Sequence, residues 1–215
     1  MKKILLLGDS IRLGYERYVS EMLQDVATVY TPGDVNGGMA QFVLRWVHEW
    51  KRRGNFPDDM DVVHWNAGLW DVLRICGDEP LTPPEFYVDT LRRISQRLRL
   101  IFPKAKQIFA LSTWVQEDLY RGEYKRFNSD IQLFNKLAVE TLAPLGVEFN
   151  DLHTVTVNAP QACWSDMTHF NTLEGIRLVG GQVVDCLCSH IGVDRTSLAE
   201  REAKLFEIPE AILGN

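Results

Sequence analysis

The stretch Ile4-Leu5-Leu6-Leu7-Gly8-Asp9-Ser10 decides the fold. Four consecutive apolar residues are typical of a strand that is covered on both faces, and Gly8-Asp9-Ser10 supplies residues that turn a chain and cap a helix. Apolar residues then recur at spacings of three and four from Tyr15 to Val26, which indicates an amphipathic helix. The N-terminus therefore predicts a buried strand followed directly by a helix.

The same alternation of strand and helix continues along the chain. Short apolar runs predict further strands at 26–30, 61–65, 107–111 and 147–149, and helical stripes lie at 42–50, 87–101, 134–141 and from about 171 to 187. Ser129 and Gln132 match a capping box before the third stripe, and 151–170 is expected to be irregular. Strands that alternate with helices predict a parallel sheet with right-handed crossovers.

We therefore expect an α/β fold, a three-layer α/β/α sandwich with a flavodoxin-like five-stranded parallel sheet. Residues 1–193 form the single predicted domain, and residues 194–215 form a charged tail that is compatible with a short helix. Hydrophobic residues make up 46% and charged residues 24% of the 215 residues, which is ordinary for a globular protein and argues against disorder.

Charge and cysteine usage exclude several classes of function. The 23 basic and 29 acidic residues give a net charge of −6, which disfavours binding to nucleic acid. No apolar run approaches the roughly 20 residues that span a bilayer, and the N-terminal run is shorter than the roughly 7 to 15 residues of a secretory signal core. The four cysteines lack metal-type spacing, so reduced thiols in a cytoplasmic protein are the simplest interpretation.

Polar clusters follow four of the predicted strands. They are Gly8-Asp9-Ser10, Asn36-Gly37-Gly38, Asn66-Ala67-Gly68-Leu69-Trp70-Asp71 and Ser165-Asp166-Met167-Thr168-His169. In a sheet of this type, ligands bind beyond the carboxyl ends of the strands. These four segments are therefore expected to form one site.

Within these segments, a hydroxyl, an imidazole and a carboxylate have the chemistry of a catalytic triad. A serine becomes a useful nucleophile when a base takes its proton and a third group orients that base. We predict Ser10 as the nucleophile, His169 as the base and Asp166 as the orienting acid. An oxyanion hole would need the backbone N–H groups of Ser10 and Gly38 and a side-chain amide.

These blocks resemble those of the GDSL, or SGNH, hydrolase family. Gly8-Asp9-Ser10-Ile11 is similar to its nucleophile block, Gly38 to its glycine block and Asp166-Met167-Thr168-His169 to its Asp-x-x-His block. Arg126-Phe127-Asn128 looks like the polar helix start often seen before the family's fifth strand. The resemblance runs from about Lys2 to His190, and it implies the triad and oxyanion roles given above.

One block departs from the family pattern. The family's usual Gly-x-Asn-Asp supplies an oxyanion asparagine, but the same frame reads Gly68-Leu69-Trp70-Asp71 here. Asn66 lies two residues before Gly68, and Asn-x-Gly-x-x-Asp is similar to a branch of these hydrolases with a shifted asparagine. We therefore expect Asn66, rather than Trp70, to supply the side-chain donor.

The resemblance implies a serine esterase that works through an acyl-enzyme. The expected substrate is a small or carbohydrate-borne carboxylic ester, with acetyl as the acyl group, and Trp70 and Trp164 are candidate residues to line its site. No cofactor is expected, and no metal, because Asp151 and His153 lack a third ligand. A lipid or thioester acylhydrolase and a catalytically weak binding protein of the same fold remain alternatives. A nucleotide binder is disfavoured because no phosphate-binding loop follows the first strand.

Overall fold

A five-stranded parallel sheet forms the centre of the protein. The computed structural model describes residues 1–213, and the strand order in the sheet is β2-β1-β3-β5-β7. The strands are β1 (Lys2–Leu7), β2 (Ala27–Tyr30), β3 (Val62–Trp65), β5 (Lys106–Ala110) and β7 (Glu148–Asn150). The central position of β1 explains why its four apolar residues are all fully buried.

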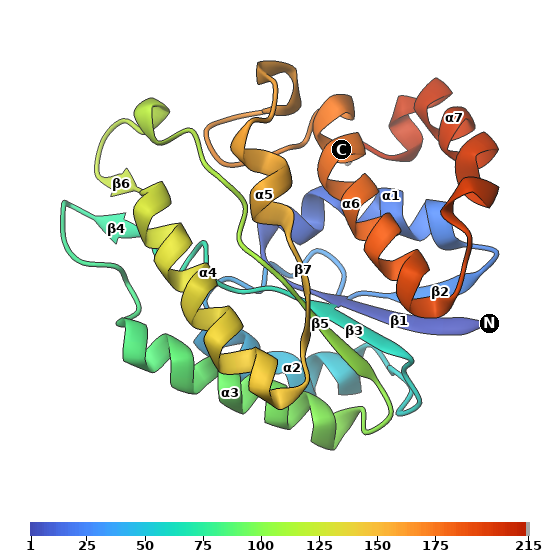
Figure 1. Cartoon of the computed structure of the whole chain (residues 1–215), viewed down its shortest axis with the longest axis horizontal. Helices are drawn as coiled ribbons and strands as arrows, with labels where there is room; N and C mark the ends of the chain where they lie inside the picture. Colours follow the sequence, from blue (N-terminus) through green and yellow to red (C-terminus); the bar gives the residue numbers. More distant parts are fainter. Residues whose placement is uncertain (214–215) are drawn as a thin grey trace.

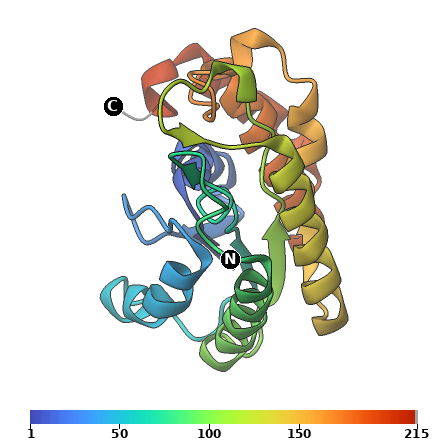
Figure 2. The ribbon, with the colours of Figure 1, turned by 90° about the vertical axis from the view of Figure 1, so that its left-hand side faces the viewer.

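Helices cover both faces of this sheet (Figures 1 and 2). One face carries α1 (Ser10–Leu23) and α6 (Leu173–Ile191), which pack against each other. The other face carries α2 (Ala40–Arg53), α3 (Pro84–Ile101) and α4 (Asn128–Leu142), which pack in that order. The predicted α/β/α sandwich is therefore confirmed.

Capping groups set the helix ends that border the site. The Asp9 carboxylate accepts a hydrogen bond of 3.0 Å from the Ile11 N–H and so caps α1. The Thr172 hydroxyl accepts from the Gly175 N–H at 3.0 Å at the start of α6. The capping box predicted at Ser129 does not form, because α4 already begins at Asn128 and no side chain caps it.

The structure also contains elements that the sequence pattern missed. A small antiparallel pair joins β4 (Arg74–Ile75) to β6 (Tyr124–Lys125), which brings the segment after β3 beside the segment after β5. The stretch expected to be irregular contains a short helix, α5 (Leu152–Val157). Two residues of strand and six of helix are too short to produce a readable period. Short 3₁₀ turns lie at Glu117–Leu119, Ala143–Leu145, Gln161–Cys163, Arg195–Leu198 and Pro209–Ala211.

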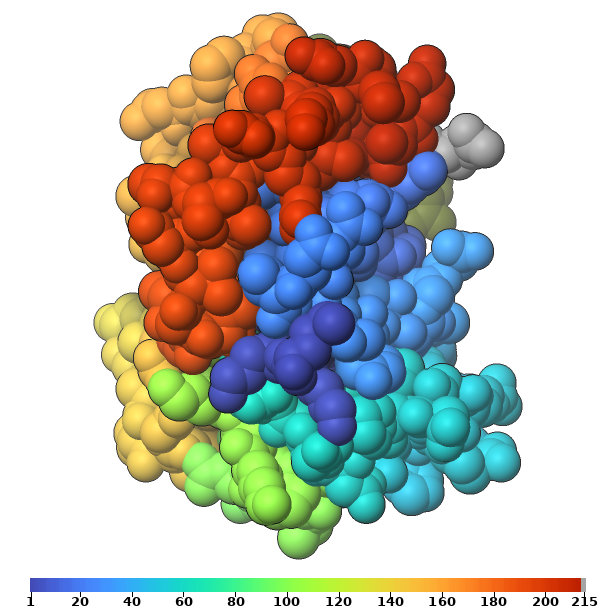
Figure 3. All heavy atoms as spheres, turned by 90° about the vertical axis from the view of Figure 1, so that its right-hand side faces the viewer, coloured from blue at the N-terminus to red at the C-terminus, as the bar shows by residue number. Residues whose placement is uncertain are grey.

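The C-terminal segment packs against α1. Its helix α7 (Ala199–Glu207) lies in the segment predicted as a charged tail, and the last two residues of that segment lie outside the described residues. Phe206 contacts Tyr18 with ring centroids 5.7 Å apart, and Arg201 donates to the Met22 carbonyl at 3.0 Å. Figure 3 shows this segment in red against the blue N-terminal residues. Within residues 1–213, none of the helices combines the length and apolar character needed to cross a membrane.

Candidate active site

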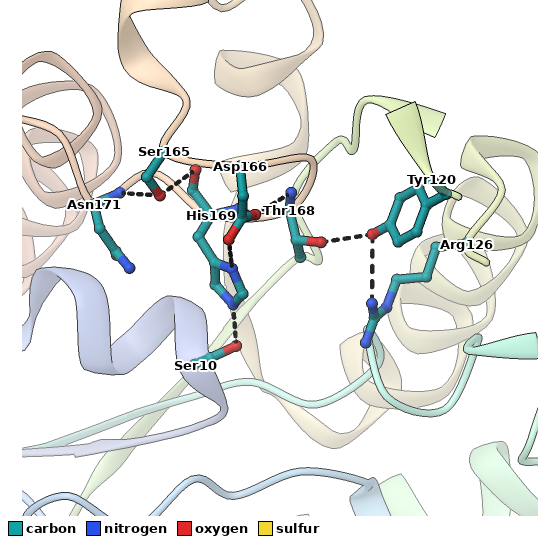
Figure 4. Close-up of polar contacts among 8 residues, drawn as sticks. All are labelled: Ser10, Tyr120, Arg126, Ser165, Asp166, Thr168, His169 and Asn171. Atoms are coloured by element: carbon teal, nitrogen blue, oxygen red, sulfur yellow. Dashed lines mark hydrogen bonds and ion pairs between the residues drawn. The ribbon is translucent and has the colours of Figure 1, made fainter. Parts of the chain in front are cut away.

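Ser10, His169 and Asp166 lie in one hydrogen-bonded line (Figure 4). The Ser10 Oγ and His169 Nε2 atoms are 2.8 Å apart, and His169 Nδ1 is 2.7 Å from Asp166 Oδ2. In the tautomer that uses both contacts, Nδ1 carries the proton and donates to Asp166, which leaves Nε2 to accept from the serine hydroxyl. Residues 159 positions apart in the chain are thus brought into the order hydroxyl, imidazole and carboxylate that a catalytic triad requires.

The Asp166 carboxylate is fixed by its own loop. Its Oδ1 atom accepts the backbone N–H groups of Thr168 at 2.7 Å and His169 at 2.8 Å, while Oδ2 faces the imidazole. Partial burial acts to raise the pKa of Asp166, but the hydrogen bonds from Thr168 and His169 outweigh it and hold the pKa below its usual value. Asp166 therefore stays ionised beside His169 under ordinary conditions.

Ser10 is the first residue of α1, directly beyond the buried strand β1. The first N–H groups of a helix have no partner inside the helix, and the helix dipole places positive potential there. The Ser10 side chain is partly exposed while Asp9 beside it is fully buried. The Ser10 hydroxyl therefore lies at a position that favours negative charge.

Two glycines bring the loop after β2 against the loop after β1. The Gly37 N–H donates to the Gly8 carbonyl at 2.8 Å, and a Cβ atom on Gly37 would lie 2.6 Å from that same oxygen. Gly38 has a φ of +55°, a conformation that side chains disfavour. The Gly38 N–H donates to Asn36 Oδ1 at 2.9 Å, so the loop forms a tight turn that carries the predicted backbone donor next to Ser10.

Known structures share this arrangement of strands and helices. No protein-family model and no curated protein matches the chain. The lipase/acylhydrolase of Enterococcus faecalis superposes with a TM-score of 0.65 at 21% identity, over 88% of this chain and 96% of that chain. A GDSL-like lipase of Bacteroides thetaiotaomicron gives 0.67 at 16% identity, over 87% and 88%. The acetylxylan esterase Axe2 of Geobacillus stearothermophilus gives 0.64 at 16% identity, over 90% and 95%.

This chain has the GDSL-type acylhydrolase fold. The predicted fold resemblance is thereby confirmed over most of the chain. In this GDSL-type fold, Ser10, Gly38, Asn66 and His169 all lie beyond the carboxyl ends of their strands, at one edge of the sheet.

Asn66 follows β3 directly and lies beside Gly8 and Asp9. Its backbone N–H donates to the Leu7 carbonyl at 3.1 Å, and its side chain is 6% exposed. The Asn66 Oδ1 atom packs so closely on Gly8 that a Cβ atom there would lie 1.8 Å away. Gly8 is therefore required by this contact, and Asn66 is held next to the residue that precedes the nucleophile.

Two buried carboxyl groups lie under the site. Burial raises the pKa of Asp9, against the hydrogen bond from the Asn66 side chain and the charge of Arg126, which lower it. Burial also raises the pKa of Asp71 to about 7. Asp71 accepts the Ala40 N–H at 3.1 and 3.3 Å with its two oxygens and so caps α2 from a distant part of the chain.

A cavity of about 660 Å³ opens beside Gly38. Trp70 lies on one side of it, and the start of α2 lies on the other; its lining residues are Asn36, Gly38, Met39, Gln41, Phe42, Arg45 and Trp70. The Arg126 guanidinium lies 5.6 Å from the centre of the Trp70 ring. This volume lies in the range typical of small-molecule sites.

Trp164, a predicted lining residue, is not among the residues that line this cavity. Its side chain is buried, its ring packs on Phe170 with centroids 4.2 Å apart, and its indole N–H donates to the Ala159 carbonyl at 3.3 Å. These contacts pack the ring within the loop that carries His169. Trp164 supports that loop.

Arg12 is a structural contributor that the sequence did not reveal. It is fully buried two residues beyond Ser10, donates to the Gly33 carbonyl at 3.0 Å and to the Val35 carbonyl, and pairs with Glu16. Arg12 and Glu16 at i and i+4 are typical of an exposed helix surface, so their spacing does not indicate burial. Arg12 ties the loop that contains Gly38 to the helix that starts at Ser10.

Proposed function

We propose that this protein is a serine esterase that hydrolyses a small or carbohydrate-borne carboxylic ester, with acetyl as the preferred acyl group. The observation that carries the proposal is the continuous line from Ser10 Oγ through the imidazole of His169 to Asp166. Three supporting features surround it: a helix N-terminus at Ser10, a glycine turn at Gly38 and an adjoining cavity.

In the acylation step, the Ser10 oxygen attacks the ester carbonyl carbon while His169 Nε2 takes the hydroxyl proton. The carbonyl π electrons move to oxygen, and the tetrahedral oxyanion forms. As it collapses, the bond to the alcohol oxygen breaks, and His169 returns the proton to that oxygen. A water molecule then repeats the sequence on the acyl-enzyme, with His169 as base and then as acid, and releases the carboxylic acid and Ser10.

We infer that the oxyanion is stabilised by the N–H groups of Ser10 and Gly38 and by the Asn66 amide. The Gly38 N–H already donates to Asn36 Oδ1, so it must share that hydrogen or release Asn36 when the oxyanion forms. The Asn66 side chain packs against Gly8, two residues before Ser10, so its amide belongs to the same end of the sheet as the proposed nucleophile. Donors of this type act mainly in the transition state.

The cavity beside Gly38 supports an acceptor with both apolar and hydroxyl groups. Trp70 and Phe42 present aromatic rings, and Asn36, Gln41 and Arg45 add hydrogen-bonding groups at its edge. A sugar ring has apolar C–H faces and polar hydroxyl edges, which suit such a lining. Two of the structures with this fold are acetylxylan esterases, which also act on acylated carbohydrate.

A second candidate, a lipid or thioester acylhydrolase, is favoured by one feature. A neighbouring cavity of about 370 Å³ shares Phe42 with the first and is lined largely by apolar side chains, among them Val35, Trp46 and Trp50. A long acyl chain would gain free energy from burial along such a surface.

A chain-length series separates the two candidates. Purified protein is assayed on p-nitrophenyl esters from acetate to palmitate, and then on acetylated xylo-oligosaccharides. Highest kcat/KM on acetate, with release of acetate from the sugars, supports the carbohydrate esterase. A rise in kcat/KM with acyl length supports the acylhydrolase. If no ester is cleaved and a fluorophosphonate fails to label Ser10, the protein is a binding protein and the proposal is wrong.

A further inference from the structure

A hydrogen-bonded bridge connects the loop of the candidate base to two other loops of the site (Figure 4). The Tyr120 hydroxyl lies 2.6 Å from Thr168 Oγ1, and Thr168 immediately precedes His169. The Arg126 guanidinium donates to the Tyr120 hydroxyl at 3.4 Å and to the Leu69 carbonyl. Tyr120 and Arg126 thus link the segments that follow β5 and β7, and Arg126 extends the link to the segment that follows β3.

The donors and acceptors of these hydrogen bonds follow from the chemistry of the three side chains. Arginine only donates, so the Tyr120 oxygen accepts from Arg126, and the Tyr120 hydrogen is available for Thr168 Oγ1. The side chains of Tyr120 and Thr168 are nearly buried, at 8% and 5% exposure. A buried hydroxyl without a hydrogen-bond partner destabilises the fold, so the Tyr120 and Thr168 hydroxyls hold each other in place.

The bridge adds a side-chain contact to the other hydrogen bonds that hold this loop. At the opposite end, Ser165 donates its N–H and its hydroxyl to the His169 carbonyl, at 2.9 and 3.1 Å. The Met167 carbonyl accepts from the Gln116 N–H at 2.9 Å. The Tyr120 hydroxyl is the side-chain contact that ties down Thr168, whose N–H also binds Asp166.

We propose that Tyr120 is a positioning residue that, through Thr168, holds Asp166 and His169 in line with Ser10. The proposal rests on the proposed esterase function. Tyr120 touches neither the triad nor the cavity beside Gly38 among the contacts of residues 1–213, so it acts through the loop. Small displacements of a catalytic group lower the rate of the chemical step more than they weaken substrate binding.

The first test is the Tyr120→Phe variant, which removes one oxygen atom and keeps the buried ring. On p-nitrophenyl acetate at 25 °C we expect kcat to fall about tenfold or more with KM nearly unchanged. Tyr124→Phe is the matched control, because Tyr124 lies in the same segment and is 58% exposed. Its kinetics should equal those of the wild type. Melting temperatures of both variants show that the assays are made on folded protein.

The second test separates positioning from stability at Thr168. Thr168→Val keeps the shape and removes the hydroxyl, whereas Thr168→Ser keeps the hydroxyl. We expect Thr168→Val to lower kcat as Tyr120→Phe does, and Thr168→Ser to retain most of the turnover. Because both changes break the same contact, the double variant Tyr120→Phe, Thr168→Val should lose no more than either single variant.

Distinct results contradict the inference and the proposed function. If the wild type cleaves no ester and takes no fluorophosphonate label, the esterase proposal fails. If the wild type is active and Tyr120→Phe lowers only the melting temperature while kcat is unchanged, Tyr120 is purely structural and the inference is wrong. Multiplicative losses in the double variant would also overturn it, since the two hydroxyls would then act separately.

Discussion

Replacement of Asp71 by asparagine is expected to make the protein more stable at neutral and alkaline pH. Asp71 is fully buried, and burial raises its pKa to about 7 from the ordinary value of 3.8. A raised pKa means that the folded protein binds this proton more tightly than the unfolded chain does. The stabilising effect of Asp71 is therefore fully present below about pH 4 and is lost as the pH rises to about 7.

The magnitude follows from the size of the shift. A difference of about three pKa units corresponds to about 4 kcal/mol across the whole window, at 1.36 kcal/mol per unit. Between pH 5 and pH 8, the contribution of Asp71 to the free energy of unfolding falls by about 2.5 kcal/mol. The fall is smaller than the full value of about 4 kcal/mol because part of it occurs below pH 5 and because Asp71 also ionises in the folded state near pH 7. For a chain of this size, this change corresponds to a melting temperature that is roughly 5–10 °C lower at pH 8 than at pH 5 because of Asp71 alone.

Asparagine retains an oxygen that can accept the Ala40 N–H, which Asp71 now binds at 3.1 Å. It carries no charge, so the variant should lose the part of the pH dependence that Asp71 causes. The assay is urea unfolding at pH 5 and pH 8 of the wild type, Asp71→Asn and the exposed control Asp118→Asn. The free energy of unfolding of Asp71→Asn should rise relative to that of the wild type when the pH is raised from 5 to 8. Parallel pH curves for all three proteins would refute the reasoning.

The remaining predictions concern the site. Ser10→Ala should abolish hydrolysis and leave the melting temperature nearly unchanged; turnover of p-nitrophenyl acetate close to the wild-type rate would contradict Ser10 as the nucleophile. Asn66→Ala should lower kcat by roughly 100-fold or more with little change in KM, and Trp70→Phe should be mild; the reverse result would move the donor to Trp70. EDTA should leave turnover unchanged, and a loss restored by a divalent cation would indicate a metal site.

The order of strands and helices was predictable because buried elements show a clear pattern of apolar residues in the sequence. Both faces of β1 are covered, so Ile4–Leu7 form a continuous apolar run that ends at Gly8. The positions of the polar clusters followed from the topology alone, since parallel strands end at one edge. Ser10 and His169 lie 159 positions apart in the chain, yet both could be assigned to the same edge before their contact was seen.

The residues that support the site could not be predicted, because each acts through a single tertiary contact that produces no periodic pattern in the sequence. Asp71 caps α2 from 31 residues away, and Tyr120 reaches Thr168 across 48 residues. Arg12 looks like a surface residue by its spacing to Glu16, and the structure buries it completely. The same limit applies to Trp164, since an aromatic residue near a histidine in the sequence carries no information on which way its ring faces.

Asp9 shows how one buried group serves both the fold and the chemistry. Its carboxyl group caps α1, faces the Asn66 amide and is attracted by Arg126, so groups that follow β1, β3 and β5 converge on it directly before Ser10. An ionised carboxylate there would repel an oxyanion that forms at Ser10. Burial raises the pKa of Asp9 and so acts against the charge that would cause this repulsion. In the proposed mechanism, the ionised carboxylate is Asp166, which contacts the far side of the imidazole and would stabilise the imidazolium formed during attack.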